Sequence, residues 1–587
     1  MSNAERKRIA LLAALILLVT LPFWVANPYQ LHIAALIGVY WVLIAGLNLV
    51  AGYTGPISVG HVGLLSVGAY TFAILAGKYG WSPATAAALA GAMGGLCGFL
   101  LGLPSLRLPG FYFAMSTLAC SLIIGELALA KQSLTGGGVG IAVPPFSPPF
   151  HTPRGFYWLV LLLAGAATWL TWNVARRMWG RALITVRDSV VTAQAVGVPI
   201  LRVKLTVFVF SGVSAGVAGA LFGSLQSYIT PDTFVFEMGL FFFVCIIIGG
   251  RGGILGPLIG TAVLTTLPEL SAPLAKLGNF LYGVLMLAVV LLIPEGIGRL
   301  LELAVARLRG RRPTSVPVAP NLERLRDTVT KDWTPTTASL QARAITRRFG
   351  GVVALSQVAL EVRPGEVHGL IGPNGSGKTT LLNLFSGYYR PDEGSIRLGG
   401  EELSRLPVQR RAAIGVARTF QKPRLLPSLT VVDNTMIGGF SGTRAGFVES
   451  ALCLPRSVRE DNQLRRRAID LLTGVGLGGV LSRRAGLLEH AEQRFLEIAR
   501  GLMARPTFLL LDEPAGGLTG AEIEHLQSII HVARDAGIGV LLVEHHTDFV
   551  FRVSDRVTTL DLGKVIKHGA PIDVRSDPEV IRVYLGA

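Results

Sequence analysis

VHGLIGPNGSGKTT, from Val367 to Thr380, is the stretch that decides the fold of the second half of the chain. Its first five residues are apolar enough for a buried strand, and Leu381–Ser386 follows with a helical pattern. The loop between them fits G-x-x-x-x-G-K-[ST], which binds phosphate where it joins a strand to a helix. Its glycines let backbone N–H groups approach phosphate oxygens, and a helix N-terminus favours their charge. The stretch therefore predicts a nucleotide-binding α/β domain.

Two side chains of this loop have a predicted role. We expect Lys378 to reach the β- and γ-phosphates of ATP, and the hydroxyl of Thr379 to ligate Mg²⁺. The predicted ATP-binding residues of the loop are Gly372, Pro373, Asn374, Gly375, Ser376, Gly377, Lys378, Thr379 and Thr380.

Two later apolar runs end in residues that suit phosphate hydrolysis. Phe508–Leu511 leads into Asp512, which fits a Mg²⁺ ligand, and Glu513, which fits the base or positioner of the attacking water. Val540–Glu544 leads into His545, which we expect to contact the γ-phosphate as a catalytic residue.

Two more residues complete the predicted nucleotide site. Gln421, in the run ARTFQ, is expected to be a catalytic residue that ligates Mg²⁺ and senses the nucleotide at the interface with the membrane part. Phe349 is expected to stack on adenine, although taken alone it would be interpreted as a core residue.

The two halves of the chain differ in composition. The 587 residues include 54 Lys and Arg against 37 Asp and Glu, but only about 8% of residues 1–310 are charged, against about 23% of residues 311–587. Disorder and a secreted disulfide scaffold are excluded. The net charge of +17 divides as +10 in the apolar half and +7 in the other. Membrane proteins carry such an excess in cytoplasmic loops, so we expect no nucleic-acid partner.

The apolar half predicts an all-α polytopic membrane domain of about eight to ten helices, because a spanning helix needs about 20 apolar residues. Basic residues cluster where an even number of spans returns the chain to the cytoplasm, which places the N-terminus and the nucleotide domain inside. The expected spans lie at about 9–26, 31–50, 57–77, 84–103, 110–130, 156–175, 205–228, 237–250, 254–275 and 279–295.

The loop Arg176–Lys204 is the longest predicted cytoplasmic connection. Its centre has the pattern of a short helix with Ala193 and Gly197 on or near a small apolar face, and we expect it to dock on the nucleotide domain rather than to be a solvated loop. Glu126, a carboxylate within a span, is a candidate for the transport path, because such a group is costly in lipid.

These observations divide the chain into three parts. Residues 1–310 form the predicted transmembrane domain. Residues 311–339 are rich in Pro, Thr and charge without periodicity, and are interpreted as a linker. Residues 340–587 form the nucleotide domain.

The phosphate loop, Gln421, the pair Asp512 and Glu513, and His545 together resemble the ATPase of an ABC transporter, in family order. The subtype resembles the ATPases of branched-chain amino acid uptake, on the strings RFGG (348–351), ARTFQ (417–421), LEIAR (496–500) and EPAGGL (513–518). The resemblance implies an α/β P-loop ATPase domain with a helical subdomain at about 425–505, and ATP and Mg²⁺ as cofactors.

The apolar half is similar to the matching permease family. The resemblance implies a coupling loop around Arg187, Asp188, Ala193 and Gly197. It also implies an inner-membrane assembly with a second permease, a second ATPase and a periplasmic substrate-binding protein. The strings that carry it are GLNL (46–49), GYTG (52–55), SVGH (58–61), LPGFYFA (108–114), TGGG (135–138), RDS (187–189) and IGG (248–250).

One loop departs from the family pattern. The signature loop, usually Leu-Ser-Gly-Gly-Gln, is here Leu488, Glu489, His490, Ala491 and Glu492. In the family this loop contacts the γ-phosphate bound to the opposite subunit, so a carboxylate and an added Cβ there are unfavourable. We therefore expect an asymmetric pair, in which a partner ATPase supplies an intact signature loop; a tolerated variant is the alternative.

Three other functions stay open at this point. Urea or short-chain amide import by the same family is not separated by these residues. A half-size exporter would need about six long helices that extend into the cytoplasm, which the short Gly- and Pro-broken spans disfavour. A membrane ATPase or regulator that transports nothing would agree with the altered signature loop.

Overall fold

The computed structural model describes residues 13, 16–25, 27–106, 108, 110–250, 252–271, 283, 284, 287, 320–331 and 337–585. The chain divides into two compact units. The first comprises Met1–Arg176 and Leu201–Arg311, and the second comprises Arg177–Ile200 and Arg312–Ala587. The connection that was expected to dock on the nucleotide domain thus belongs to the same unit as the phosphate loop.

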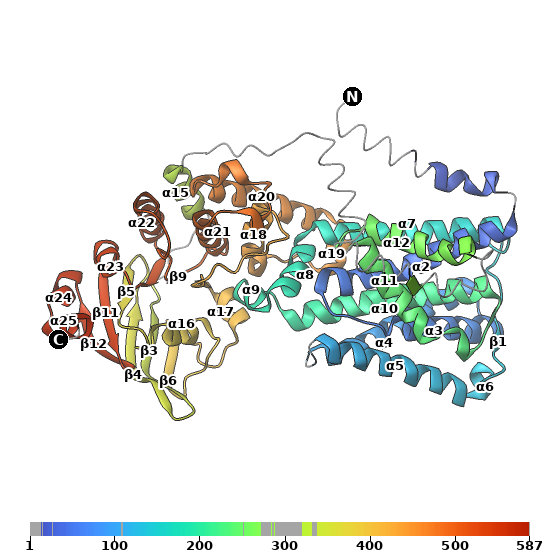
Figure 1. Ribbon diagram of the computed structural model, residues 1–587, viewed down its shortest axis with the longest axis horizontal. Helices are drawn as coiled ribbons and strands as arrows, with labels where there is room; N and C mark the ends of the chain where they lie inside the picture. The colour runs from blue at the N-terminus through green and yellow to red at the C-terminus, as the bar shows by residue number, and fades with distance from the viewer. Residues whose placement is uncertain are drawn as a thin grey trace. The chain divides into compact units, whose positions relative to one another are not determined.

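The first unit is built from helices (Figure 1). Two short strands, β1 (Ile141–Ala142) and β2 (Tyr228–Ile229), pair antiparallel. The helices are α2 (Pro28–Asn48), continued by the π-helical η1 (Leu49–Thr54), α3 (His61–Phe72), continued by η2 (Ala73–Lys78), α4 (Pro83–Gly102), α5 (Gly110–Ala130), α6 (Gln132–Thr135), α7 (Pro153–Arg176), α10 (Ile200–Gln226), α11 (Phe236–Gly249) and α12 (Leu255–Ser271).

Six helical stretches in the described part of this unit are long and apolar enough to cross a membrane. The polytopic all-α prediction is therefore confirmed. The expected span at 57–77 corresponds to α3 and η2 together, and the one at 254–275 begins as the shorter apolar stretch Leu255–Pro268. Of the span at 279–295 only residues 283, 284 and 287 are described, and the basic residues at 6–8, 107 and 299–312 lie outside the described residues. The six stretches are Pro28–Thr54, Pro83–Gly102, Gly110–Ala130, Pro153–Arg176, Ile200–Gln226 and Pro231–Gly249.

Glycines allow α4 and α10 to pack closely. A Cβ on Gly94 would lie 2.3 Å from the carbonyl oxygen of Gly212, and a Cβ on Gly212 would lie 2.2 Å from that of Gly94. No side chain fits at either position without moving a backbone. Small residues at a crossing of membrane helices serve this close approach.

A glycine-rich break after Gly249 separates α11 from α12. Asn48, buried at the end of α2, donates from Nδ2 to the carbonyl oxygen of Gly253 at 2.8 Å. A side-chain amide therefore satisfies a backbone acceptor in this turn, as irregular backbone in an apolar environment requires.

The second unit contains a six-stranded sheet in the order β12-β11-β5-β10-β9-β8. The neighbours from β11 to β8 are parallel, and β12 is an antiparallel edge strand. The phosphate-loop strand β5 thus lies beside β10, which leads into His545, and β10 lies beside β9, which ends in Asp512, so the carboxyl ends of the three strands meet. The strands are β5 (Val367–Ile371), β8 (Val416–Arg418), β9 (Phe508–Asp512), β10 (Gly539–Val543), β11 (Arg556–Asp561) and β12 (Lys564–Gly569).

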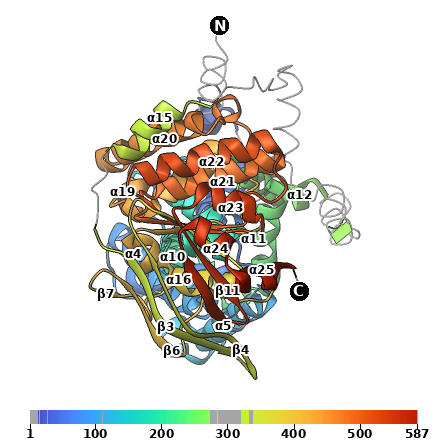
Figure 2. The same cartoon turned by 90° about the vertical axis from the view of Figure 1, so that its left-hand side faces the viewer.

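A four-stranded antiparallel sheet, in the order β4-β3-β6-β7, completes the α/β part (Figure 2). Its strands are β3 (Leu340–Phe349), β4 (Val352–Val362), β6 (Glu393–Leu398) and β7 (Glu401–Glu402). Ile345 of β3, Phe385 of α16 (Lys378–Ser386) and Leu510 of β9 belong to one buried apolar cluster that joins the two sheets. The α/β P-loop fold predicted from the sequence is confirmed.

The helices of this unit include four, α18 to α21, that lie in the range predicted for a helical subdomain. The helices are α8 (Met178–Asp188), α9 (Val190–Ala195), α15 (Leu322–Thr330), α16 (Lys378–Ser386), α17 (Val408–Ile414), α18 (Val431–Met436), α19 (Phe447–Ala451), α20 (Pro455–Gly474), α21 (His490–Met503), α22 (Gly520–Asp535), α23 (Thr547–Val553), α24 (Pro571–Arg575) and α25 (Pro578–Leu585).

One segment differs from its prediction. Residues 311–339 were expected to be a linker without periodic structure, but α15 lies within them. Leu325 and Val329 of this helix are buried, and the backbone N–H of Asn321 donates to the carbonyl oxygen of Gly474 on α20. Two buried apolar residues are too few for a periodicity signal, so packing rather than propensity stabilises this helix.

Candidate ATP-hydrolysis and coupling site

The phosphate loop has the backbone that the motif requires. Gly377 has φ +104°, and a Cβ there would lie 2.6 Å from the side chain of Leu355. Lys378 begins α16, and its Nζ donates to the carbonyl oxygens of Gly372 (2.7 Å) and Pro373 (2.9 Å). Burial lowers the pKa of Lys378, while the nearby carboxylates of the site oppose that shift. The amine is therefore held over the loop, where phosphates would bind.

Glu513 lies between the two other predicted catalytic residues. Its Oε2 accepts a hydrogen bond from Nε2 of Gln421 at 2.7 Å, and its Oε1 contacts Nε2 of His545. Its backbone is in the left-handed region, at φ +48°, and its N–H donates to the carbonyl oxygen of Val543 at 2.8 Å. Such a conformation is costly for a residue with a side chain and persists where the surroundings fix it. The structure thus brings Gln421, Glu513 and His545 together.

Glu544 is a residue of this site that sequence reasoning missed. It is buried, its Oε1 accepts from the N–H of Ala515 (2.6 Å), and its Oε2 accepts from the N–H of His545 (3.0 Å). Burial raises its pKa, and these two N–H groups oppose that shift. One carboxylate therefore holds the loops after β9 and β10 in register.

Asp512 is paired with an arginine that was also missed. Its Oδ2 accepts from Nη2 of Arg418 at 3.0 Å, and both side chains are about 4% exposed. Arg418 also donates to Oδ1 of Asn383 and to Oγ of Ser386 on α16. Burial raises the pKa of Asp512, and the guanidinium of Arg418 opposes that shift. The signal for Arg418 was its place three residues before Gln421, at the end of a buried strand.

The residues predicted to hold Mg²⁺ supply oxygen ligands. These are the hydroxyl of Thr379, the amide oxygen of Gln421 and the carboxylate of Asp512. Within the described residues no group of three or more His, Cys, Asp or Glu is placed to hold a metal ion. Mg²⁺ that binds with nucleotide is usually held by one or two carboxylates together with phosphate oxygens. Ser376, buried on the loop with an unpartnered Oγ, adds one more free oxygen, so the set fits the ion.

Phe349 lies at the end of β3 and is 38% exposed. Its ring is 5.1 Å from that of Tyr389, edge to face, and the guanidinium of Arg347 lies 4.7 Å from its centroid. The residue is not a core residue, so the aromatic surface expected to meet adenine is accessible.

A buried ion pair supports the loop that carries Gln421. Glu497 of α21 accepts from the N–H groups of Phe420 (3.3 Å) and Arg424 (3.1 Å) and from Nη2 of Arg500 (3.1 Å). Arg500 in turn donates from Nη1 to the carbonyl oxygen of Arg424 at 2.8 Å. Both ends of the loop Phe420–Arg424 are therefore fixed by one pair. No role was predicted for this pair, because its i,i+3 spacing is also that of an ordinary surface pair.

The segment Arg177–Ile200, called the coupling segment below, contacts this same loop. Thr192 of α9 donates to the carbonyl oxygen of Arg424 at 3.1 Å, and Tyr388 donates to that of Val191 at 2.8 Å. Ala193 is fully buried on α9. The expected docking of this segment on the nucleotide domain is observed within the second unit.

Other predicted residues of the segment also meet the nucleotide domain. Nη2 of Arg187 donates to Oγ of Ser428 at 3.2 Å, and that hydroxyl donates to Asp188 at 2.9 Å. Gly197 has φ +81°, and a Cβ there would lie 3.0 Å from Cβ of Ser441. The positions inferred from the resemblance thus lie on the contact surface.

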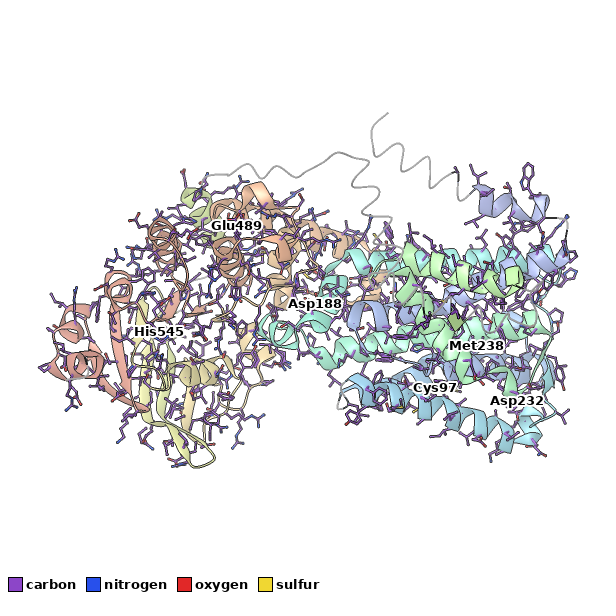
Figure 3. All side chains as sticks on the ribbon, viewed as in Figure 1. Cys97, Asp188, Asp232, Met238, Glu489 and His545 are labelled. Atoms are coloured by element: carbon purple, nitrogen blue, oxygen red, sulfur yellow. The ribbon has the colours of Figure 1, made fainter. Side chains whose placement is uncertain are left out.

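The altered signature loop forms the start of α21. Leu488 is buried and Glu489 is exposed at the N-cap, with its N–H donated to Glu492 at 2.9 Å. His490 lies close to Gly517, where a Cβ would be 2.9 Å from its ring, and Ala491 is half-buried in the first turn. Figure 3 shows Glu489 well away from His545, so this loop does not complete the chain's own hydrolytic site.

Glu126 is not brought together with another predicted site residue. It lies on α5 and is exposed on the surface of the first unit.

Comparison with known proteins covers both units. Residues 29–290 match the family described as branched-chain amino acid transport system, permease component, and residues 355–516 match the ABC transporter family. The ATP-binding protein BraF of Pseudomonas aeruginosa, for high-affinity branched-chain amino acid transport, is 39% identical over 42% of this chain and 97% of its own length. LivG of Salmonella typhimurium, described in the same terms, is 38% identical over the same shares.

A third relative, the ribose import ATP-binding protein RbsA 2 of Rubrobacter xylanophilus, is 37% identical over 42% of this chain and 45% of its own length. The chain is a multi-pass membrane protein and an ATP hydrolase coupled to transport. It belongs to the branched-chain amino acid transport family of ABC transporters, and it carries that family's permease component and ATP-binding component on one polypeptide.

Proposed function

We propose that this chain drives the import of branched-chain or other hydrophobic amino acids across a bacterial-type inner membrane. The observation that supports coupled transport is the loop Phe420–Arg424. Gln421 on this loop bonds the catalytic candidate Glu513, and the carbonyl oxygen of Arg424 accepts from Thr192 of the coupling segment. One short loop thus contacts both the hydrolytic site and the connection between membrane helices α7 and α10.

The proposed chemistry uses residues that the structure holds in place. Backbone N–H groups of the phosphate loop and Lys378 would bind the phosphates of ATP. Mg²⁺, when bound, would be held by Thr379, Gln421 and Asp512 and would neutralise charge on the β- and γ-phosphate oxygens. Glu513 orients the attacking water and accepts its proton while the bond from the γ-phosphorus to the bridging oxygen of ADP breaks.

His545 and Phe349 have supporting roles in this proposal. His545, in contact with Glu513, would donate to an oxygen of the γ-phosphate, and Phe349 would stack on adenine. We assign residues 1–310 to the permease domain and 340–587 to the ATPase domain. The N-terminus and the ATPase domain would be cytoplasmic.

The proposed assembly contains a second permease, a second ATPase with an intact signature loop and a periplasmic substrate-binding protein. ATP on this chain's Lys378 would then meet a normal signature, whereas ATP on the partner would meet Glu489 and Ala491. Replacing both by the usual residues, Glu489→Ser with Ala491→Gly, should raise the ATPase rate of the assembled complex. An unchanged rate would support a tolerated variant instead.

The test of transport is uptake by proteoliposomes that contain the assembled complex and its binding protein. ATP-dependent accumulation of labelled leucine or valine, lost in Glu513→Gln, is the expected result. Accumulation of urea or a short amide in place of amino acids would move the substrate to the alternative within the family. The ATPase half does not separate these substrates, because it is similar to relatives named for amino acid and for ribose transport.

The altered signature loop favours one second candidate, a membrane ATPase that regulates rather than transports. The exposed carboxylate of Glu489 occupies the serine position of the usual signature. If the assembled complex binds and hydrolyses ATP but accumulates none of these solutes, the regulatory function is the better description.

A further inference from the structure

Arg181 is the most enclosed charge of the coupling segment. Its side chain is 7% exposed, and it lies on α8, before the α9 helix that contacts the loop Phe420–Arg424. From the sequence alone, Arg181 is interpreted only as one of the basic residues that cluster on the cytoplasmic side of a membrane protein. A residue that serves topology alone needs no partner, because the positive-inside rule counts charges rather than contacts.

The structure gives Arg181 two partners on different helices. Its Nε donates to Oδ1 of Asp433 on α18 at 2.7 Å, and its Nη1 donates to Oδ1 of Asp461 on α20 at 2.6 Å. Asp433 is fixed further by the hydroxyl of Thr430 at 2.6 Å. A guanidinium is planar with donors in a fixed fork, so bonding two carboxylates at once fixes its direction as well as its position.

Neighbouring residues of α8 extend the same contact. Nε1 of Trp179 donates to the carbonyl oxygen of Ala445 at 3.2 Å, and its ring packs edge to face on Phe447 of α19 at 5.4 Å. Arg177 places Nη1 4.0 Å from Asp461. The start of α8 therefore contacts α18, α19 and α20, whereas α9 contacts Tyr388 and Arg424.

We propose that Arg181 is a positioning residue that fixes α8 to the helical part of the ATPase domain and thereby gives the coupling segment a second anchor. The inference rests on the proposed coupling of ATP hydrolysis to transport. With one anchor, α9 would follow the Gln421 loop but could pivot about it. With two, a change in the ATPase domain sets both the position and the direction of the segment that leads into α10.

The first test is Arg181→Met in the assembled complex, with ATP hydrolysis and solute uptake measured on the same proteoliposomes. Because Arg181 touches none of the hydrolytic residues, we expect ATPase activity to remain and the uptake per ATP hydrolysed to fall by about fivefold or more, a common size of coupling effect. Arg181→Lys keeps the charge but not the fork, and should give an intermediate ratio. An unchanged ratio, or equal loss of ATPase and uptake, would overturn the inference.

A second variant separates positioning from charge balance. Arg181→Met removes the nearest counter-charge of two half-buried carboxylates, which is destabilising in itself. The triple variant Arg181→Met, Asp433→Asn, Asp461→Asn removes those charges and should restore thermal stability without restoring the uptake ratio. Recovery of the ratio in the triple variant would show that Arg181 only balances charge, and would refute the positioning role.

The matched control is Arg324→Met. Arg324 makes an equally short pair with Asp470, at 2.6 Å, but its side chain is 49% exposed and lies on α15, away from the coupling segment. Arg324→Met should leave the uptake per ATP hydrolysed unchanged.

Hydrogen exchange gives a readout that does not need a transported solute. In the full-length protein, Arg181→Met should speed exchange of the α8 amides, residues 178–188, and leave those of β5 unchanged. If the wild-type complex imports no amino acid but this local effect appears, the transport proposal fails and the anchor stands. Unchanged exchange of the α8 amides would refute the inference that Arg181 anchors α8, whatever the complex transports.

Discussion

Replacing Glu497 by Gln tests whether a buried charge on α21 holds the loop Phe420–Arg424 in place. Glu497 is 2% exposed, and its two oxygens accept from the N–H groups of Phe420 and Arg424 and from Arg500. Burial raises the pKa of this carboxyl, and Arg500 opposes that shift. Glutamine has nearly the same shape, so the change removes charge and one acceptor without making a cavity.

The size of the effect follows from these contacts. Oε1 of Glu497 accepts from Arg424 and Arg500, and Oε2 accepts from Phe420. If the amide oxygen takes the Oε1 position, the NH₂ group meets the N–H of Phe420 donor to donor, and an unsatisfied buried N–H costs about 1–3 kcal/mol. Arg500, with a side chain 4% exposed, also loses its counter-charge. Breaking a buried pair by removing one partner costs about 3–5 kcal/mol in all, and we expect about 3 because glutamine itself is cheaper to bury.

The assay compares the free energy of unfolding of the second unit, from denaturant titration of the full-length protein, with the ATPase rate. Glu497→Gln should lose about 3 kcal/mol of stability, and its ATPase rate should fall because Gln421 lies on the released loop. Glu522→Gln is the matched control, because that carboxylate is only half-buried and accepts a single backbone N–H, from Thr519 at 2.7 Å. A loss within about 1 kcal/mol of the control, with an unchanged ATPase rate, would refute this account of the loop.

Three further predictions concern other parts of the chain. Burial lowers the pKa of His368 to about 4, below the usual 6.5, so protonation of the unfolded state removes stability as pH falls between these values. The free energy of unfolding, from denaturant titration, should therefore fall between pH 7 and pH 4 by about 3 kcal/mol less in His368→Gln than in the wild type. An equal fall in the two proteins would contradict this. Gly377→Ala forces a Cβ into a left-handed position 2.6 Å from a β4 side chain, and should weaken ATP binding measured by calorimetry by about tenfold or more. Gly212→Val should break the α4–α10 packing and abolish a monodisperse peak in size-exclusion chromatography, whereas Gly125→Val, where a Cβ meets nothing within 4 Å, should not.

The residues of the proposed hydrolytic site could be named from the sequence because their signals are local. A phosphate loop needs only a strand, glycines and a helix start within a short stretch, and carboxylates that follow buried parallel strands meet at one sheet edge. The order β5-β10-β9 then places Glu513 and His545 together, as the motifs implied.

What the sequence did not predict depends on pairing between distant segments. Arg181 and Asp461 are separated by 280 positions, and Arg418 and Asp512 by 94. Each arginine fits a simpler explanation when taken alone, as a topology signal or as part of a family string. Only the three-dimensional fold shows that each is buried against a carboxylate. Helix α15 was missed for a related reason, because its two buried residues gain their stability from α20 rather than from a pattern of their own.

The altered signature loop is compatible with the fold of this chain. At the start of α21 the N–H of Glu489 is satisfied by Glu492, and a carboxylate near a helix N-terminus is stabilising by about 0.3–1 kcal/mol. The chain therefore folds normally around Glu489, and the consequence of the substitution concerns whatever lies opposite this exposed side chain. If that is the γ-phosphate of a partner-bound ATP, two like charges about 4 Å apart at a protein surface repel by on the order of 4 kcal/mol, or about a thousandfold in affinity.

The charge, rather than the missing hydroxyl, is then the dominant part of the proposed asymmetry. Glu489→Gln keeps the size of the side chain and supplies no serine, yet it should recover most of the ATPase gain of the double replacement Glu489→Ser with Ala491→Gly. If Ala491→Gly alone recovers it, the Cβ that blocks a close backbone approach is the cause, and the electrostatic account is wrong.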